Sequence, residues 1–434
     1  MTATVDAVVV GAGPAGSAAA LTLARAGKQV LLVERGPWPG SKNMYGGVVH
    51  GRILDTLVPR WWEQVPAQRW VTRRATMVLT PTQSLTVDFR SDAWGRPPYN
   101  GCTTLRPEFD AWLAGQATAA GAELVCETVV TGPVLDGAGR VVGVDVDRPG
   151  GRVEAPIVVA CDGVNSFVAK AAGLYPAAPA RHFTLGAKEV LALPRDEIDR
   201  RFGLRGDEGA DVEILGATGD VAGGGFLYTN ADTVAIGVVL SLPGLARSGR
   251  RPEELIADLK AHPAMAPLVA GGELKEYSAH LIPEGGYDTM PALTGDGILV
   301  AGDAAALCLA AGIWLEGVNF AIASGAAAGR AAAAALDAGD TSAAGLAGYR
   351  RRLETSFVLA DHRRLRRAPE LLLSDRVQHA YPRVACDTVE RLFTVTNPLP
   401  KAGAARAAWA ALRRAGVPLP DLARDAWTAL RSYG

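Results

Sequence analysis

The chain has 434 residues and a formal net charge of −1; 49% of its residues are hydrophobic and 21% are charged. A chain of this length is expected to form two or three domains. Its composition, with 50 glycines, is typical of a glycine-punctuated α/β protein and excludes a disordered chain. Because the net charge is close to zero, no overall field attracts nucleic acid, and we expect no nucleic-acid partner.

The five cysteines are spread along the chain, at Cys102, Cys126, Cys161, Cys308 and Cys386. None belongs to a Cys-x-x-Cys pair, so the local spacing provides no zinc or iron–sulfur site, and we predict no bound metal. The first apolar run begins near the N-terminus, which leaves no room for a signal peptide. No uncharged apolar run reaches the roughly 18 residues of a membrane span. We therefore expect a cytoplasmic protein with reduced cysteines and no transmembrane span.

The first 34 residues carry the most informative pattern. An apolar run, Ala7–Val10, predicts a buried parallel strand, and the small residues after it predict a helix that ends near Gly27. A second apolar strand, Val30–Val33, then ends in Glu34. The pattern is that of a dinucleotide-binding unit: a strand, a glycine turn, a helix, a second strand and an acid, in this order. The complete pattern is a far more specific signal than the glycine triplet alone.

Each residue of this unit has its own physical role. Gly11 permits the tight turn, Gly13 lets the backbone approach a pyrophosphate, and Gly16 lets the helix pack closely on the strand. The helix N-terminus offers unpaired N–H groups and a positive dipole end to the phosphates. Glu34 can accept hydrogen bonds from ribose hydroxyls, and its charge repels the 2′-phosphate of NADP. We assign the dinucleotide contacts of this unit to Gly11, Gly13, Ala15, Gly16, Glu34 and Arg35.

A long connection rich in Pro, Gly and Trp follows, from Arg35 to about Asn100. Connections of this length in compact domains are usually functional. Its glycine-rich segment contains Lys42 and Tyr45, which are candidates to contact a cofactor or a substrate. A loop built for its backbone shape alone explains the same segment equally well. A helix is predicted after the connection, over residues 105–121.

The rest of the chain alternates strand-like and helical runs. Strands are predicted within residues 123–130, 141–146, 157–163, 184–191, 212–215, 225–229, 234–240 and 297–303, and helices over residues 195–202, 252–262 and 318–336. The mixture over residues 180–284 indicates an antiparallel sheet with flanking helices, inserted into the first domain. The glycine run Gly223–Gly225 lacks the context of a second dinucleotide site, and we interpret it as a turn.

The strand predicted within residues 297–303 and the helix predicted over residues 318–336 provide further candidate cofactor contacts. Asp303, at the carboxyl end of the strand, can accept a hydrogen bond from a ribityl hydroxyl. The helix that begins near Gly317 can direct its positive end at the pyrimidine side of a flavin, where it stabilises the anionic reduced ring. Taken in this order, the motifs favour FAD over NAD. The additional cofactor contacts are assigned to Lys42, Arg106, Asp162, Gly302, Asp303, Gly317, Val318 and Asn319.

These patterns predict an α/β fold in which a Rossmann-like FAD-binding domain carries an inserted antiparallel α+β substrate domain and a helical C-terminal segment. We expect the FAD-binding domain to comprise residues 1–180 and 286–344. The inserted domain is expected over residues 181–285, and the helical segment over residues 345–434.

Several longer strings of the sequence resemble a known family. They are Arg106-x-x-Phe109-Asp110, Cys161–Gly163, Ala301–Ala305, Pro39–Asn43, Lys188–Val190, Gly225–Asn230 and Ala279–Tyr287. The first three resemble the large FAD-dependent group of hydroxylases, geranylgeranyl reductases and electron-transfer flavoprotein:quinone oxidoreductases. The others resemble the short, nitrogen-fixation-associated members of the quinone oxidoreductase branch.

The resemblance implies an FAD-dependent oxidoreductase that takes electrons from an electron-transfer flavoprotein and passes them to a quinone or a ferredoxin acceptor. In this branch the iron–sulfur cluster belongs to a separate ferredoxin-like partner, which agrees with the scattered cysteines. One departure stands out: the family's basic pair before Glu-Gly is replaced by the apolar segment Leu309–Gly317, which contains Trp314. Such a segment equally suits a pocket for a hydrophobic small molecule. The alternative function is therefore a self-contained reductase, dehydrogenase or monooxygenase.

Three side chains are candidates for the reaction itself: His280, Trp314 and Tyr45. His280 could donate protons near the flavin because its ordinary pKa is close to neutral, although a structural histidine is the simpler interpretation. Seven arginines lie between Arg350 and Arg367. A basic face there would suit an acidic ferredoxin, a flavoprotein or anionic lipid at the inner face of a membrane, whereas a solvated helical face is the simpler explanation.

Overall fold

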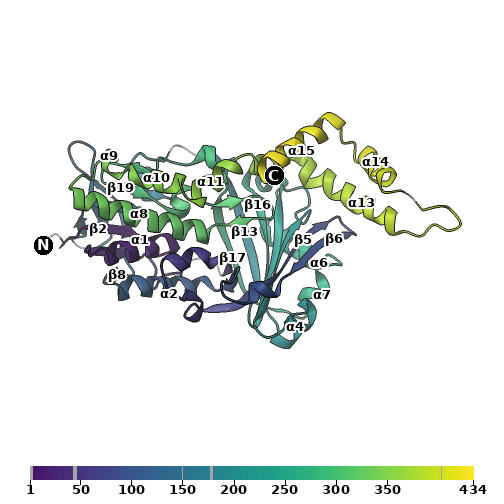
Figure 1. Ribbon diagram of the computed structural model, residues 1–434, viewed down its shortest axis with the longest axis horizontal. Coiled ribbons are helices and arrows are strands. Elements are labelled where there is room, and N and C mark those ends of the chain that lie inside the picture. Colours follow the sequence, from purple (N-terminus) through teal and green to yellow (C-terminus); the bar gives the residue numbers. More distant parts are fainter. Residues whose placement is uncertain (1–2, 43–45, 149, 176–178, 402) are drawn as a thin grey trace.

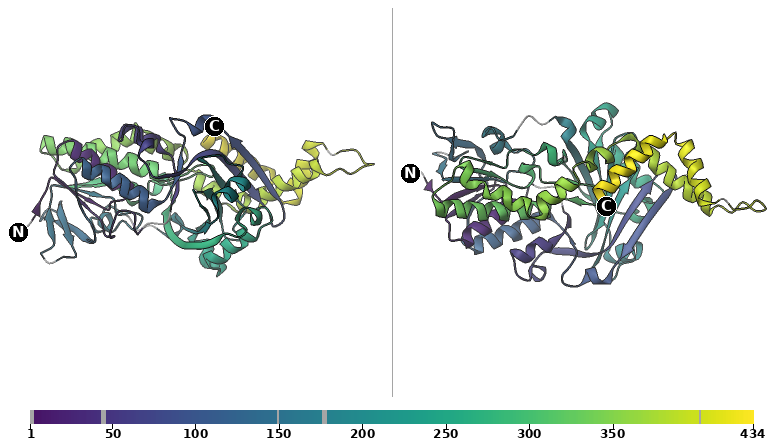
Figure 2. Two further views of the ribbon diagram at one scale, coloured as in Figure 1. Left: turned by 90° about the horizontal axis from the view of Figure 1, so that it is seen from below. Right: turned by 45° about the horizontal axis from the view of Figure 1, so that its top comes forward.

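The computed structural model describes residues 3–42, 46–148, 150–175, 179–401 and 403–434. It contains a first lobe with a mostly parallel sheet, a second lobe built on a larger mixed sheet, and a helical C-terminal arm (Figure 1). Two further views show the arm projecting away from both lobes (Figure 2). The predicted fold class, an α/β Rossmann-like domain with an antiparallel α+β part and a helical C-terminal segment, is confirmed.

The first lobe is organised by a sheet with the strand order β18-β19-β12-β2-β3-β8. Its strands are β2 (Ala7–Val10), β3 (Val30–Val33), β8 (Glu123–Val125), β12 (Ile157–Ala160), β18 (Thr294–Gly295) and β19 (Ile298–Val300). All neighbours are parallel except β18 and β19. The two central strands β2 and β12 are fully buried, as expected of a parallel sheet that is covered on both faces.

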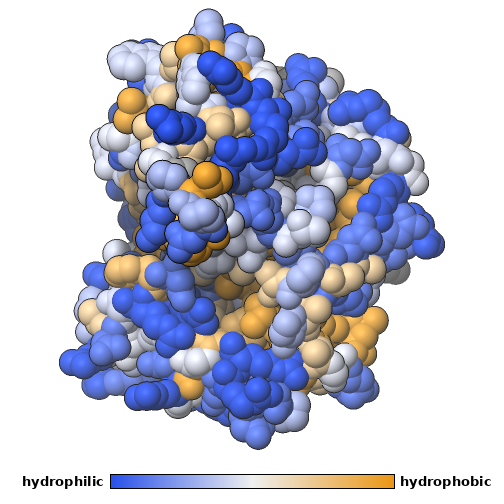
Figure 3. All heavy atoms as spheres, turned by 90° about the vertical axis from the view of Figure 1, so that its right-hand side faces the viewer, coloured by the Kyte–Doolittle hydropathy of each residue, from blue (hydrophilic) through white to orange (hydrophobic). Residues whose placement is uncertain are grey.

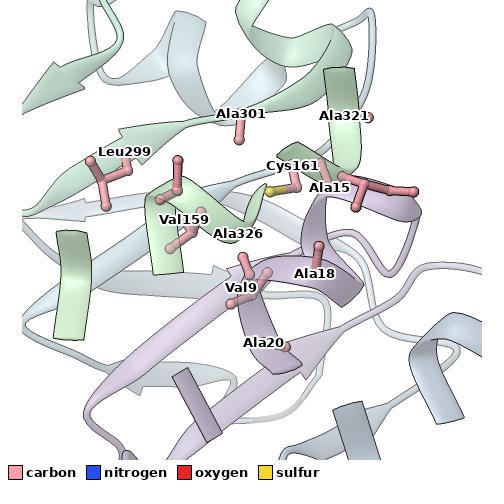
Figure 4. Close-up of a cluster of buried hydrophobic side chains, with 14 of the residues drawn as sticks. Val9, Ala15, Ala18, Ala20, Val159, Cys161, Leu299, Ala301, Ala321 and Ala326 are labelled. Atoms are coloured by element: carbon pink, nitrogen blue, oxygen red, sulfur yellow. The ribbon is translucent and has the colours of Figure 1, made fainter. Parts of the chain in front are cut away.

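Two long helices pack against each other beside this sheet: α1 (Pro14–Arg25) and α8 (Val318–Ala338). Small residues line their contact, and Figure 4 shows the alanines of both helices lying beside the side chains of β2, β12 and β19. A Cβ atom at Gly325 would collide with the carbonyl oxygen of Ala15, and one at Gly329 would lie 2.7 Å from that of Ala19. The two backbones therefore approach as closely as they do because these positions are glycines.

A small sheet with the order β1-β11-β10-β9 and several helices complete the first lobe. The strands are β1 (Ala3–Thr4), β9 (Val130–Leu135), β10 (Val141–Val146) and β11 (Arg152–Glu154), and the helices include α2 (Arg106–Ala119), α3 (Phe167–Ala171), α9 (Ala343–Leu346), α10 (Gly348–Glu354) and α11 (Phe357–Arg364). The strand predicted over residues 123–130 is divided here between β8 and β9. An irregular segment lies between the two strands, so that they join different sheets.

The second lobe contains a sheet with the order β17-β13-β16-β15-β14-β5-β7-β4, to which β6 adds beside β5. Its strands are β4 (Gly47–Val49), β5 (Ala67–Leu79), β6 (Ser84–Arg90), β7 (Cys102–Thr104), β13 (Phe183–Ala192), β14 (Glu208–Leu215), β15 (Gly223–Thr229), β16 (Thr233–Ser241) and β17 (Glu273–Pro283). Helices α4 (Arg195–Phe202), α5 (Leu242–Ser248), α6 (Pro252–Ala261) and α7 (Ala266–Val269) accompany it. Buried apolar side chains of the sheet and of α4 and α6 form a separate core.

Two expectations about this lobe are wrong, and one of its strands was missed. The connection from Arg35 to about Asn100 is no loop, because it contributes β4, β5 and β6, and β5 pairs in parallel with β14. Gly223–Gly225 is not a turn but the start of β15. The sequence analysis also missed β17, whose polar residues alternate with few apolar ones. The predicted domain boundaries stay a prediction, although strands from residues 47–104 and from 183–283 share one sheet.

The C-terminal arm consists of helices that pack beside the second lobe, where one of them contacts β5 and β6, and that also project beyond it (Figure 1). They are α12 (Ala368–Leu372), α13 (Tyr381–Phe393), α14 (Ala404–Arg414) and α15 (Leu419–Tyr433). Asp425 of α15 accepts hydrogen bonds from Arg376 Nε at 2.6 Å and from Tyr381 Oη at 2.7 Å, which ties α15 to the beginning of α13. Figure 3 views the molecule from the side of the arm and shows hydrophobic residues among hydrophilic ones on this face.

None of the helices in the described part of the chain combines the length and the apolar character that crossing a membrane requires.

The helix contact yields a first prediction. Gly325→Ala should destabilise the first lobe, because the new methyl group would meet the backbone of α1 and the two helices would have to separate. Overpacking of this kind costs about 1–3 kcal/mol, which a urea unfolding curve measures. Gly115→Ala in α2 is the matched control, since no heavy atom lies within 4 Å of its added Cβ. That control should leave stability unchanged or raise it by about 0.5–1 kcal/mol; equal losses in both variants would contradict the prediction.

Candidate functional site

A cavity of about 340 Å³ lies at the carboxyl ends of β2, β3, β12 and β19. Open α/β sheets bind their ligands at this edge. The structure brings most of the predicted site residues together around it. Those that line it are Gly11, Gly13, Ala15, Glu34, Arg35, Lys42, Arg106, Asp162, His280, Asp303, Gly317 and Val318.

The glycine turn between β2 and α1 forms one side of this cavity. Gly11 has φ +94°, and a Cβ atom there would lie 2.5 Å from the carbonyl oxygen of Cys161. A Cβ atom at Gly16 would collide with the carbonyl oxygen of Gly11, whereas nothing lies within 4 Å of a Cβ at Gly13. Gly11 and Gly16 therefore shape the turn, and Gly13 leaves space in front of the helix N-terminus. This space suits a pyrophosphate.

Glu34 closes β3 and is almost fully buried. Its carboxylate accepts hydrogen bonds from the backbone N–H of Ala12 at 3.0 Å and from that of Gly36 at 2.7 Å. These two bonds fix the carboxylate against the glycine turn. Each carboxylate oxygen can accept more than one hydrogen bond, so the group can also receive ribose hydroxyls.

Asp162 follows β12 and also borders the cavity. Its Oδ2 accepts a hydrogen bond from the backbone N–H of Val168 at 2.9 Å, whereas its buried Oδ1 has no hydrogen-bond partner among the described residues. Burial raises the pKa of this carboxyl group. A buried polar atom without a partner indicates a ligand that supplies a donor.

Three charged or titratable side chains of the cavity lining influence one another: Arg106, His280 and Asp303. Burial raises the pKa of Asp303, while Arg106 and His280 oppose the shift. Burial lowers the pKa of His280, while Asp303 opposes that shift. Arg106 is held by the buried Asp110, which accepts two hydrogen bonds from its guanidinium at 2.8 Å each. The three groups therefore form one electrostatic cluster, into which the N-terminus of α8 also points from Gly317.

Three assigned contacts lie beside the cavity rather than in its wall. Gly302 is buried against α1, where its Cβ would lie 2.8 Å from that of Ala15. Gly16 packs against the turn in the same way. Asn319 is buried, and its side-chain amide donates to Glu316. Their role in cofactor binding stays a prediction, and the geometry gives each of them a part in holding the surrounding backbone.

The three catalytic candidates are separated. His280 lines the cavity. Trp314 does not: it lies in the hairpin formed by β20 (Leu309–Ala310) and β21 (Leu315–Glu316), and its ring stacks on Tyr433 of α15 at 5.9 Å between centroids. Tyr45 lies outside the described residues. A direct reaction of Trp314 with a group in this cavity has no support from its position.

Sequence reasoning assigned no role to Lys188, which lies on β13 and is fully buried. Its Nζ donates to Tyr228 Oη at 2.7 Å and to the carbonyl oxygen of Gly46 at 3.0 Å. Burial lowers the pKa of Lys188 to about 7, although Glu276 opposes the shift. Lys188 thus ties the sheet to the end of the glycine-rich segment. A lysine within an apolar strand was the available signal, because buried lysines are rare.

A second cavity, of about 480 Å³, lies between the larger sheet, the β20–β21 hairpin and the C-terminal helices. Its lining is predominantly apolar and includes the bare backbone of Gly223–Gly225. Cys308 lines the first cavity and Ala310 the second, so their Cα atoms are at most about 7.6 Å apart. Leu315 likewise lines the second cavity and Gly317 the first. The hairpin is therefore the partition between the two cavities.

The fold and the first cavity together define an FAD-dependent oxidoreductase. The glycine turn would hold the pyrophosphate, Glu34 the adenosine ribose, and the N-terminus of α8 the flavin ring; FAD bound there would accept and donate electrons. Among the described residues, no group of three or more His, Cys, Asp or Glu side chains is arranged to hold a metal ion.

Comparisons with known proteins agree with this class. Residues 4–198 match the model of an FAD binding domain. The probable electron transfer flavoprotein-quinone oxidoreductase YdiS of Escherichia coli K12 is 40% identical over 391 residues, which cover 90% of each chain. Protein FixC of Escherichia coli O157:H7 is 40% identical over 397 residues, 91% of this chain and 92% of the relative. The chain therefore belongs to the family of FAD-dependent oxidoreductases that contains FixC and YdiS.

Solved structures share the fold. A geranylgeranyl bacteriochlorophyll reductase-like protein from Thermoplasma acidophilum superposes with a TM-score of 0.73 at 20% identity, covering 98% of this chain and 99% of the other. The flavin-dependent brominase Bmp2 superposes with a TM-score of 0.62 at 17% identity, covering 99% and 93%. One architecture thus serves several flavin reactions, and the fold alone does not identify the substrate.

The position of Glu34 yields a second prediction. Glu34→Gln should weaken FAD binding about 10- to 100-fold, because a hydrogen bond to a charged group contributes about 1.5–3 kcal/mol. Titration of the apoprotein with FAD, followed by flavin fluorescence, measures the dissociation constant. Glu123→Gln on the exposed edge strand β8 is the control and should bind FAD as the unaltered chain does. Unchanged affinity in Glu34→Gln would remove Glu34 from the cofactor site.

Proposed function

We propose that this protein is an electron-transfer flavoprotein dehydrogenase: its FAD receives electrons from an electron-transfer flavoprotein, and they pass to a quinone. The observation that carries this proposal is the 40% identity, over 90% of each chain, to a relative whose printed name states that activity. The two adjoining cavities support it, because one suits the flavin and the other an apolar electron acceptor.

The second cavity has the properties that a quinone requires. Quinones combine a flat ring with an apolar tail, and apolar ligands bind in largely preformed, mostly hydrophobic pockets. The cavity of about 480 Å³ lies directly behind the β20–β21 hairpin, whose two ends reach the first cavity. A quinone ring there would be separated from the flavin by the hairpin alone.

A separate ferredoxin-like protein is proposed as an additional partner in this electron path. The five cysteines support it, because none of them is paired and no metal-binding cluster is found in the described part of the chain. An iron–sulfur cluster needs several cysteine ligands close together. Such a cluster would therefore have to belong to another chain.

We further propose that the C-terminal arm contacts a lipid surface peripherally. The end of α13 and its connection to α14 expose Phe393 (81%), Val395 (66%) and Leu399 (67%) to solvent. Residues 381–434 contain eight Lys and Arg and four Asp and Glu, a net charge of +4 in a chain whose total is −1. Apolar side chains beside basic ones suit a bilayer with anionic headgroups. A quinone with an apolar tail also resides in such a bilayer.

The electron donor can be tested directly. Under anaerobic conditions, a reduced electron-transfer flavoprotein should bleach the flavin absorbance of the purified protein, whereas NADH and NADPH alone should not. A short-chain ubiquinone added afterwards should restore the absorbance. Rapid reduction by NADPH without the flavoprotein would overturn the proposal. That result would favour a self-contained flavoenzyme acting on a hydrophobic small molecule, for which the apolar second cavity is the supporting observation.

The lipid contact yields another prediction. Replacing Phe393, Val395 and Leu399 together by Ser should reduce binding to vesicles of phosphatidylglycerol and phosphatidylcholine by about tenfold or more, because each buried apolar side chain contributes about 1.5–3 kcal/mol. Cosedimentation with the vesicles measures the partition. The control replaces Leu135 and Leu274 by Ser, since both are exposed, on β9 and β17 respectively. Equal binding of all three proteins would exclude the arm as the contact.

A further inference from the structure

Glu284 is a partly buried acid near the boundary between the two cavities. It directly follows β17 and lines the second cavity, while His280, four residues earlier in the chain, lines the first. Thr184 on the neighbouring β13 donates a hydrogen bond from Oγ1 to Glu284 Oε2 at 2.9 Å. Its electrostatic influence reaches Cys308, which borders the flavin cavity. The electron path proposed above gives this carboxyl group no role.

The surroundings of Glu284 keep it protonated. Burial raises the pKa of Glu284 to about 7, although the hydrogen bond from Thr184 opposes the shift. The other carboxylate in the cavity wall, Glu213, differs because it forms an ion pair with Arg74. Glu284 is therefore a neutral acid in an apolar cavity below about pH 7, and it carries a proton that it can donate.

We propose that Glu284 is the proton donor to a quinone bound in the second cavity, a role that rests on the quinone reductase function proposed above. Reduction of a quinone to a quinol adds two electrons and two protons. Reduced FAD held in the first cavity would supply the two electrons and one of the protons. The second proton comes from Glu284: its O–H bond breaks, an O–H bond forms on a quinone carbonyl oxygen, and the carboxylate is reprotonated from solvent.

The apolar lining explains why a positioned acid is needed. A reduced quinone that lacks a proton is an anion, and an isolated anion among apolar side chains is very unfavourable. A carboxylic acid at the cavity wall transfers its proton as the charge develops, which is general acid catalysis and typically contributes 10²–10⁴-fold. The apolar surroundings that keep Glu284 protonated also make an anionic reduced quinone unfavourable. The quinone must therefore receive a proton as it is reduced.

Other titratable groups lie on the elements around Glu284: Cys308, His182, Tyr433, and Glu213 with its neighbour Asp211. Burial raises the pKa of Cys308 and of Tyr433 and lowers that of His182, so these three are neutral near pH 7. Burial, together with Glu213, raises the pKa of Asp211 to about 7 as well. A pH profile is therefore decisive only when the unaltered chain is compared with a variant at Glu284.

The test uses Glu284→Gln, which keeps the size of the side chain and an oxygen for Thr184 but has no acidic proton. The FAD-loaded protein is reduced anaerobically and mixed with ubiquinone-1 in a stopped-flow instrument. Reoxidation should slow by about 100-fold or more. In the unaltered chain the rate should fall as the pH rises through about 7, whereas in the variant it should lose this dependence. Ferricyanide takes electrons without protons and should reoxidise both proteins at equal rates.

Glu273→Gln is the matched control, because Glu273 lies on the same strand but is exposed and paired with Lys275. It should behave as the unaltered chain does. An infrared spectrum gives a readout that is independent of turnover. The carboxylic acid band that appears below about pH 7 should lose the contribution of Glu284 in Glu284→Gln, while the contribution of Asp211 remains.

The outcomes separate the two proposals. If ubiquinone-1 fails to reoxidise the unaltered protein while ferricyanide succeeds, the quinone reductase function is wrong. If ubiquinone-1 reoxidises the unaltered protein and Glu284→Gln at the same rate and with the same pH profile, only the proton donor is wrong. A variant that ferricyanide also reoxidises slowly would show a disturbed flavin site and would overturn the specific role of Glu284.

Discussion

The close approach of α1 and α8 is the constraint on which the rest of the structure depends. Glycines at Gly325 and Gly329 allow the backbone of one helix to lie against that of the other. Both helices begin at the same edge of the parallel sheet, so their N-termini and positive dipole ends converge on one cavity. A cofactor with two phosphates and an electron-accepting ring needs such an arrangement, because one helix end alone serves only one of the two parts.

The second organising feature is the β20–β21 hairpin. It is short and has an apolar sequence, and its ends border the flavin cavity while its strands border the apolar one. Its position is fixed from both sides: Arg74 of β5 donates to the carbonyl oxygen of Ile313 at 2.9 Å, and Trp314 stacks on Tyr433. The larger sheet and the C-terminal arm therefore both help to hold the partition between the cavities.

The sequence predicted the parts of this arrangement that depend on local pattern. Glu34 and Asp303 both border one cavity, because each follows a strand of the same parallel sheet and the carboxyl ends of these strands meet at one edge. It did not predict that β5, from the long connection, pairs with β14, since pairing between distant strands leaves no local signal. Trp314 was a candidate because its segment departs from the pattern of the family that the sequence resembles, but its ring stacks on Tyr433 of the last helix. In the sequence, Lys188 and Glu284 stood out only because they belong to strings that resemble the family. Their possible roles depend on their surroundings in the fold, which the sequence does not show.

The stretch Gly223–Gly225 gives the apolar cavity a wall of peptide backbone. The bare backbone is a strip, because Ile214 and Val239 on the strands to either side also line the cavity. A planar aromatic or quinonoid ring can lie closely against such a strip, whereas a puckered ring or a branched chain loses contact with it. For the quinone site proposed above, we therefore expect a preference for flat molecules over saturated ones of the same size.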